Sequence, residues 1–151
     1  MAFTNHDFRD IAPDVVNVIE MIKQAEKKFP NVNFQYMEAR EAMNMCIFGD
    51  YKEPSKNILS VSFAKKQANN PVMTVKADQP TFGPQPFLAI ETADGSAYHD
   101  NLDFQEPFRE WTYTFDEHSF EWKAINRIGL GTNDLRGFPH VKVKNISEIA
   151  V

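Results

Sequence analysis

The stretch that decides the fold class is WTYTF (residues 111–115), which is followed after four polar residues by FEWKA (residues 120–124). In both segments a large or apolar side chain occupies every second position, which is the period of a β-strand with one buried face. The intervening residues 116–119 (DEHS) are polar and suit a turn. The pattern therefore predicts a β-hairpin over residues 110–125, with its rings on one face and its polar groups on the other.

The rings of this predicted hairpin are the first candidates for a functional surface. Packing into a core is the favoured interpretation, because bulky groups alternate with polar ones as they do in a half-buried strand. A protein interface is the functional hypothesis, since aromatic residues are enriched at interface centres. Stacking on single-stranded nucleic acid is disfavoured because it needs a basic surround, which the neighbouring carboxylates offset. The interface candidates are Trp111, Tyr113, Phe115, Phe120 and Trp122.

The composition indicates a globular chain with an aromatic core. Its 151 residues, 42% of them hydrophobic and 13 of them phenylalanine, suit a single domain over residues 1–151. A formal net charge of −5 argues against broad nucleic-acid binding, which depends on lysine and arginine contacts with phosphate. The sequence shows neither a signal peptide nor an apolar run of the roughly 18 residues that cross a membrane. We expect a cytoplasmic protein, or a virion protein if the chain is a viral structural component.

Residues 11–29 carry the one convincing helix signal. Asp10 can cap the start of this helix and Pro30 stops it. Because the apolar side chains gather on one face, we expect the helix to pack on a sheet. Those side chains recur at the 3.6-residue period, at Val15, Val18, Ile19, Ile22, Ala25 and Phe29.

The remainder of the chain predicts about seven or eight short strands with hairpin-length connections. Residues 32–48 favour one irregular strand, although residues 38–43 have the composition of a helix. Asp94 and Gly95 are a strong hairpin signal, and alternating lysines at 141–144 suit a strand at a sheet edge. Other strands are predicted at 58–63, 72–75, 87–92 and 97–99, and loops at 49–57, 78–86, 100–109 and 126–140.

These elements predict an α+β fold. It has one N-terminal amphipathic helix packed on a curved, mainly antiparallel sheet. No internal repeat or interdomain linker interrupts the sequence, so one domain is expected.

Acidic residues between the hairpin signal and the aromatic stretch are the strongest candidates for a ligand or metal site. His99, Asp100 and Asp103 could converge in a loop, as the oxygen ligands of a hard cation do. Their spacing matches no calcium loop, and the four histidines lack the spacing of a zinc site, so a solvated turn is the favoured interpretation. We expect no metal and no cofactor. Cys46, the one cysteine, has apolar neighbours and is expected to be a buried structural thiol.

The sequence contains no catalytic motif, and two function classes follow. The first is a non-catalytic interaction or assembly protein that binds a protein partner or itself. Ring-forming components of viral particles include small subunits with one helix and an antiparallel sheet, which makes such a subunit a fold-level analogy. The second is a ligand-binding or hydrolytic protein with a pocket between the helix and the sheet, in which Asp and His side chains act.

Overall fold

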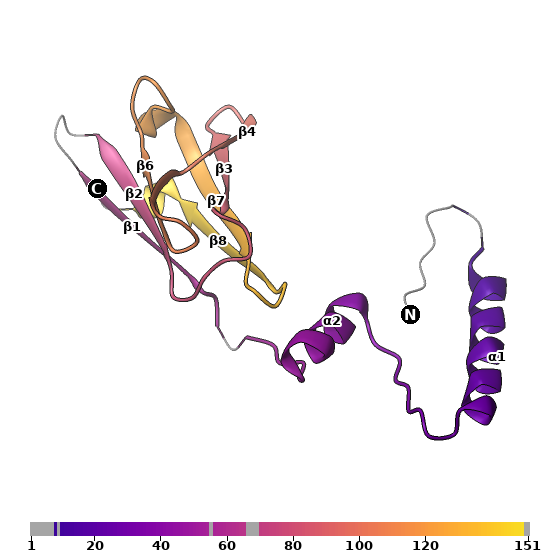
Figure 1. The fold of residues 1–151 in the computed structure, drawn as a ribbon. Coiled ribbons are helices and arrows are strands. Elements are labelled where there is room, and N and C mark those ends of the chain that lie inside the picture. The colour runs from indigo at the N-terminus through magenta and orange to yellow at the C-terminus, as the bar shows by residue number, and fades with distance from the viewer. Residues whose placement is uncertain (1–7, 9, 55, 66–69, 150–151) are drawn as a thin grey trace. The chain divides into compact units, whose positions relative to one another are not determined.

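The computed structural model describes residues 8, 10–54, 56–65 and 70–149. These residues form two helices and eight strands, which confirms the α+β class and the expected number of strands (Figure 1). The chain divides into two compact units, Met1–Tyr51 and Lys52–Val151, which we call the N-terminal unit and the β unit. The single domain expected over the whole chain stays a prediction.

Helix α1 (Ala12–Lys28) confirms the helix predicted in the N-terminal unit. The Asp10 carboxylate accepts a hydrogen bond from the Ala12 amide at 2.9 Å, which satisfies one of the free donors at the helix start. Pro13 occupies the first turn, where a missing N–H costs nothing. The packing of this helix on a sheet stays a prediction.

Helix α2 (Ala39–Phe48) corrects the strand favoured for residues 32–48. Helix-forming residues at 38–43 outweigh the alternation of apolar side chains that follows them. The helix ends at Gly49, whose φ of 76° is the left-handed conformation typical of a helix C-terminus. Cys46 lies on this helix and is exposed, so the expectation of a buried thiol is wrong.

The β unit contains two four-stranded sheets instead of the one curved sheet predicted, and neighbouring strands in both run antiparallel. The first sheet has the order β1-β2-β6-β5, formed by Leu59–Lys65, Pro71–Ala77, Glu110–Thr114 and Asp103–Glu106. The second has the order β4-β3-β7-β8, formed by Ala97–Asp100, Phe87–Thr92, Ile125–Asn133 and Pro139–Asn145.

One hydrophobic core joins the two sheets. Every second residue of the central strands is buried, as the period of a strand requires. The Asn57 side chain also donates to the Val141 carbonyl at 2.7 Å, which ties the chain before β1 to β8. The core contains Met73 and Val75 from β2, Leu88 and Ile90 from β3, Trp111 and Tyr113 from β6, and Ile128 and Leu130 from β7.

The predicted aromatic hairpin is wrong, although its first arm is a strand. Strand β6 pairs with β2 and β5, and the residues after the turn form a 3₁₀ helix, η2 (Trp122–Ala124), before β7 enters the other sheet. The turn is held by Ser119, whose hydroxyl donates to the Thr114 carbonyl at 2.7 Å. A strand that carries rings on one face can be followed by a crossing between sheets as readily as by a hairpin, because both cover the same core.

Two predicted loops also contain strands. Strand β5 lies within residues 100–109, and the nine-residue β7 lies within residues 126–140 apart from its first residue. The hairpin signal at Asp94 and Gly95 is confirmed between β3 and β4, with Gly95 at a φ of 85°. The edge position predicted for the lysine-bearing strand is confirmed for β8.

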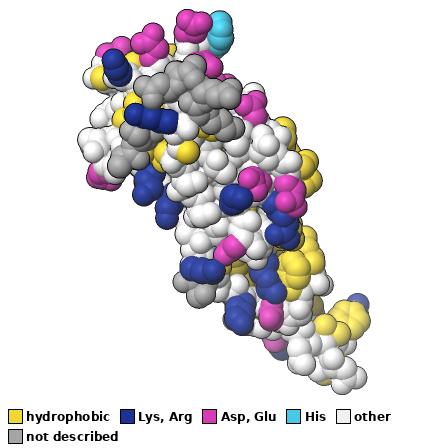
Figure 2. All heavy atoms as spheres, turned by 90° about the vertical axis from the view of Figure 1, so that its left-hand side faces the viewer, with side chains coloured by type: hydrophobic (Ala, Val, Ile, Leu, Met, Phe, Trp, Pro, Cys, Tyr) yellow, Lys and Arg dark blue, Asp and Glu magenta, His cyan; other side chains and the backbone are white. Residues whose placement is uncertain are grey.

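The outer face of the first sheet is polar. Lys76 and Glu110 form a cross-strand ion pair at 2.9 Å, and the Gln105 amide donates to the Thr112 hydroxyl at 3.1 Å. Figure 2 views the side on which β1 and β2 lie in Figure 1, and charged side chains are scattered there among uncharged ones. This face of the β unit is therefore suited to water.

Candidate functional site

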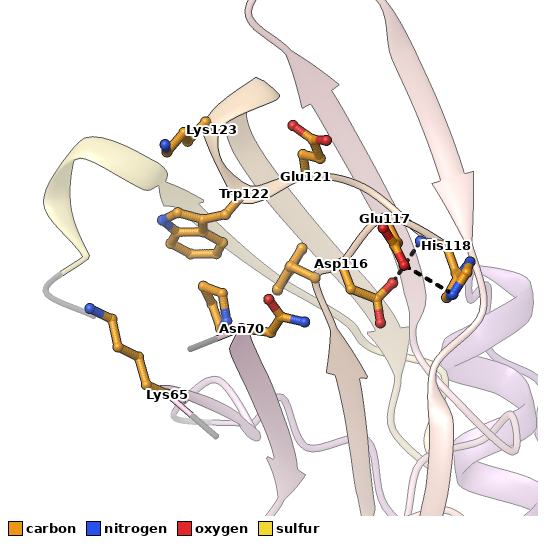
Figure 3. Close-up of a pocket in the computed structure, with 10 residues that line it drawn as sticks. Lys65, Asn70, Asp116, Glu117, His118, Glu121, Trp122 and Lys123 are labelled. Atoms are coloured by element: carbon orange, nitrogen blue, oxygen red, sulfur yellow. Dashed lines mark hydrogen bonds and ion pairs between the residues drawn. The ribbon is translucent and has the colours of Figure 1, made fainter. Parts of the chain in front are cut away.

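A hollow of about 770 Å³ lies at the end of the β unit where the chain crosses between the sheets (Figure 3). The end of β1, the start of β2, the turn after β6 and η2 provide its walls. Figure 3 shows Trp122 and Lys65 toward one end of the hollow, and Glu117 and His118 toward the other. It is lined by Lys65, Asn70, Pro71, Phe115, Asp116, Glu117, His118, Glu121, Trp122 and Lys123.

Aromatic rings form the apolar floor of this hollow. The Trp122 ring lies 5.0 Å from that of Phe115 at an interplanar angle of 70°, and 5.6 Å from that of Phe63, measured between centroids. Edge-to-face contacts of this kind add to the free energy gained from burial. The half-buried Trp122 therefore covers one end of the core and leaves part of its ring available to solvent.

The five predicted interface rings divide into two groups. Trp111, Tyr113 and Phe115 are at most 4% exposed, so they are core residues and present no surface to a partner. Phe120 and Trp122 are partly exposed and remain interface candidates. Burial of the first three follows from the inward-facing positions of β6 in a two-sheet core.

The charged groups of the hollow do not form an acid–base arrangement. Glu117 and His118 are 3.6 Å apart, but their side chains are 82% and 85% exposed, and an ion pair in water contributes little. The Asp116 carboxylate accepts hydrogen bonds from the amides of His118 and Ser119, so it serves the turn. Among the residues that the structure describes, no group of three His, Cys, Asp or Glu side chains could hold a metal ion.

The three predicted ligand or metal candidates are separated. His99 and Asp100 point to opposite faces of β4, since consecutive strand residues alternate, and Asp103 lies on β5 in the other sheet. His99 is exposed, and its ring lies 5.8 Å from that of Phe87. Asp100 faces inward and accepts a hydrogen bond from the Tyr113 hydroxyl at 2.6 Å. The Asp100 carboxylate is therefore directed toward the core, where it accepts a hydrogen bond from Tyr113, and not toward a ligand site.

Burial and the neighbouring Asp100 carboxylate raise the pKa of Tyr113 above its ordinary value of 10. The folded state therefore holds this proton more tightly than the unfolded chain does. The resulting stabilisation is complete below about pH 10 and is lost as the pH rises through the folded-state pKa.

We expect the free energy of unfolding to fall more steeply above about pH 10 in the native chain than in Tyr113→Phe, by at most about 1.4 kcal/mol per pH unit. Urea denaturation followed by circular dichroism at a series of alkaline pH values measures this difference. Tyr98→Phe is the control, because it makes the same substitution at a side chain that is 47% exposed. Equal slopes for Tyr113→Phe and the native chain would contradict the prediction.

A buried polar pair was missed by the sequence analysis. Asp134 Oδ2 and His140 Nε2 lie 3.2 Å apart, with side chains that are 4% and 3% exposed. Asp134 Oδ1 also accepts from the amides of Arg136 and Phe138, so the pair organises the turn between β7 and β8. Neither residue stands in a motif, and only long-range packing buries them.

Comparisons of this chain with protein-family models, curated proteins and solved structures found no match. Among the described residues, no helix combines the length and the apolar content that crossing a membrane requires.

Proposed function

We propose that the chain is a non-catalytic assembly protein that acts through protein–protein contacts and associates with copies of itself. The observation that carries this proposal is the exposure of apolar side chains on its helices. No residue of α1, over Ala12–Lys28, is buried, and Asn44 is the one residue buried in α2, over Ala39–Phe48. The exposed apolar side chains of the two helices include Val15, Val16, Met21, Met43, Met45, Ile47 and Phe48.

Helices of this kind need an apolar partner surface. Most of the stability of a helix in a protein comes from packing of its apolar face and not from helix propensity. In α1, Val18, Ile19 and Ile22 form a half-buried row along one side. Apolar side chains that line one side of a helix without a covering element are typical of a site of association.

The alternative of a ligand-binding or hydrolytic protein has less support. It relied on His99, Asp100 and Asp103, which lie on opposite faces of a strand and in different sheets. The most specific form of the assembly proposal is a ring-forming subunit of a larger particle, such as a viral structural component, in the cytoplasm or in a virion.

Light scattering coupled to size-exclusion chromatography tests self-association of the full chain over a range of concentrations. We expect an oligomer, and we expect Ile19→Asp to weaken association at least about 30-fold, since it places a charge in an apolar contact. Gln24→Asp is the matched control, because it introduces the same residue on the opposite face of α1 and should leave association unchanged. A full chain that stays monomeric at every concentration would overturn the proposed function.

A further inference from the structure

Strand β1 forms a long, regular edge of the first sheet. It is the outermost strand of that sheet and, among the described strands, it pairs with β2 alone (Figure 1). All seven residues of Leu59–Lys65 align with β2 in one continuous antiparallel register. An edge strand offers the amides and carbonyls on its outer side to any chain that can pair with it. The outer side of β1 is therefore a place where a further strand could add to the sheet.

The backbone groups at the centre of this edge are unpaired. The Ile58 carbonyl accepts a hydrogen bond from the Asp78 amide at 3.1 Å. Because the backbone groups of successive strand residues alternate in direction, this contact directs those of Val61 and Phe63 away from β2. The Leu59 amide follows the same alternation, since it donates to a side chain of the preceding loop at 2.9 Å. Within the part of the chain that the structure describes, no hydrogen bond satisfies the amides or carbonyls of Val61 and Phe63.

The other three edges of the two sheets carry features that oppose pairing. Strands β4 and β5 are four residues long, and the register of β5 shifts within the strand. Strand β8 begins with Pro139, and the Asn57 side chain already donates to its Val141 carbonyl. Short strands, irregular register and proline are means by which edges avoid association. Strand β1 has none of them, and its single charged residue is Lys65 at its end.

We propose that β1 of one copy pairs antiparallel with β1 of a second copy about a two-fold axis at Ser62, an inference that rests on the proposed self-association. In this register, Val61 of each copy lies opposite Phe63 of the other copy. Their amides and carbonyls exchange hydrogen bonds, so each unpaired group at the centre of the edge gains a partner. The first sheets of the two copies then form one continuous antiparallel sheet.

The inner side chains complement each other in this register. Val61 and Phe63 are half-buried and belong to the group packed against the core. A β-branched side chain opposite an aromatic ring is a favourable cross-strand pair. The Phe63 ring also lies 5.6 Å from that of Trp122, measured between centroids, so the added strand would extend the ring cluster at the edge of the core. Pairing therefore buries apolar surface as well as backbone groups.

The outer side chains and the charges suit a second copy as the partner. Ser62 lies opposite its own counterpart, and Ser60 lies opposite Ala64, so only small side chains meet on the outer face. Lys65 lies opposite Leu59, which places the two lysines at opposite ends of the paired strands, about 20 Å apart. Charges at that separation are largely screened at physiological ionic strength. The same sequence can therefore supply both strands without a conflict of size or charge between them.

This contact has a defined symmetry. Because both copies use the same surface, the pairing is isologous and closes with two copies. Larger assemblies need a second contact, which the exposed apolar side chains of α1 and α2 could supply. The expected product of β1 pairing alone is a two-fold dimer.

Like charges placed at the axis test the register. Ser62 is exposed on the outer face of β1, beside Thr74 of β2, so Ser62→Lys should keep the fold and the urea midpoint. Pairing about Ser62 would bring the two introduced lysines directly opposite each other, so we expect light scattering to show association weakened about fivefold or more. Ser62→Glu should have the same effect, and an equimolar mixture of the two variants should regain association because lysine then faces glutamate.

Ala64→Lys is the matched control for these variants. It introduces the same residue on the same exposed face of β1, but in the proposed register it lies opposite Ser60 and not opposite its own counterpart. Association should therefore be unchanged. A loss equal to that of Ser62→Lys would overturn the register and with it the inference.

Amide hydrogen exchange measures the pairing directly. We expect the Val61 and Phe63 amides to exchange at least about tenfold more slowly in the native oligomer than in Ser62→Lys at the same concentration. The inference is overturned if both amides exchange equally in the two chains, or if the mixture of Ser62→Lys and Ser62→Glu does not regain association. If Ile19→Asp disrupts the oligomer while neither Ser62 variant does, the β1 inference falls and the proposed function stands.

Discussion

Replacing Trp111 with alanine should lower the free energy of unfolding of the β unit by about 3–5 kcal/mol, the largest loss expected for a single substitution in its core. The Trp111 side chain is 0% exposed and lies on β6, paired with Val75 of β2 and Phe104 of β5. Its indole nitrogen donates to the Pro84 carbonyl at 2.9 Å, which fixes the connector between β2 and β3. Removal of a buried tryptophan costs about 3–5 kcal/mol, and typical domains have only about 5–15 kcal/mol of stability.

Thermal and urea denaturation followed by circular dichroism measure this loss. Trp122→Ala is the internal comparison, because the half-buried Trp122 covers one end of the core and its removal should cost about half as much. Trp111→Phe keeps an aromatic ring but removes the indole donor, so the Pro84 carbonyl keeps only its 3.1 Å hydrogen bond from the Phe108 amide, and an intermediate loss is expected. Equal losses for the alanine variants of both tryptophans would contradict the assignment of Trp111 to the core.

Local sequence signals predicted the elements that depend on few distant contacts. Helix α1 has a complete apolar period, a capping carboxylate and a terminating proline, so its ends were predicted within one residue. The hairpin of β3 and β4 requires a left-handed glycine at its turn, and Gly95 supplies it. Each of these signals lies within the element that it specifies.

Strand β7 could not be predicted, because its stability comes from its neighbours. Gly129 and Gly131 lower strand propensity, and turn-forming residues follow them. The strand forms because β3 and β8 pair with it on both sides and because Ile128 and Leu130 face the core. Such long-range pairing leaves no local sequence signal.

The aromatic stretch shows the limit of the candidate site prediction. Alternation placed the rings of Trp111, Tyr113 and Phe115 correctly on one face, yet it did not identify which strands would lie beside them. Without that pairing, a core position cannot be distinguished from an interface position.

A second large loss of stability is expected when Asp134 is replaced by alanine. Its carboxyl group accepts hydrogen bonds from the Arg136 amide at 2.9 Å and the Phe138 amide at 3.0 Å, and it contacts His140 Nε2 at 3.2 Å. Because this site is buried, water cannot replace the lost acceptor, and the buried donors are left unpaired. Removing one member of a buried polar network costs about 3–5 kcal/mol.

Asp94→Ala is the matched control for this prediction. Asp94 Oδ1 makes equivalent turn contacts, accepting from the Ser96 amide at 3.0 Å and the Thr92 hydroxyl at 2.6 Å, but it is exposed. Its removal should cost about 1 kcal/mol or less, since water satisfies the freed donors. Urea denaturation of both variants isolates the effect of burial on the same turn chemistry.

Asp134→Asn refines the test, because the side-chain oxygen that accepts from the two amides is retained while the second oxygen becomes an amide group. We expect it to recover the part of the stability that comes from the turn and to lose the part that comes from His140. If Asp134→Asn is as destabilised as Asp134→Ala, the contact with His140 carries the stability. If Asp134→Ala and Asp94→Ala lower the free energy of unfolding by the same amount, burial of Asp134 does not explain its contribution to stability, and the prediction is wrong.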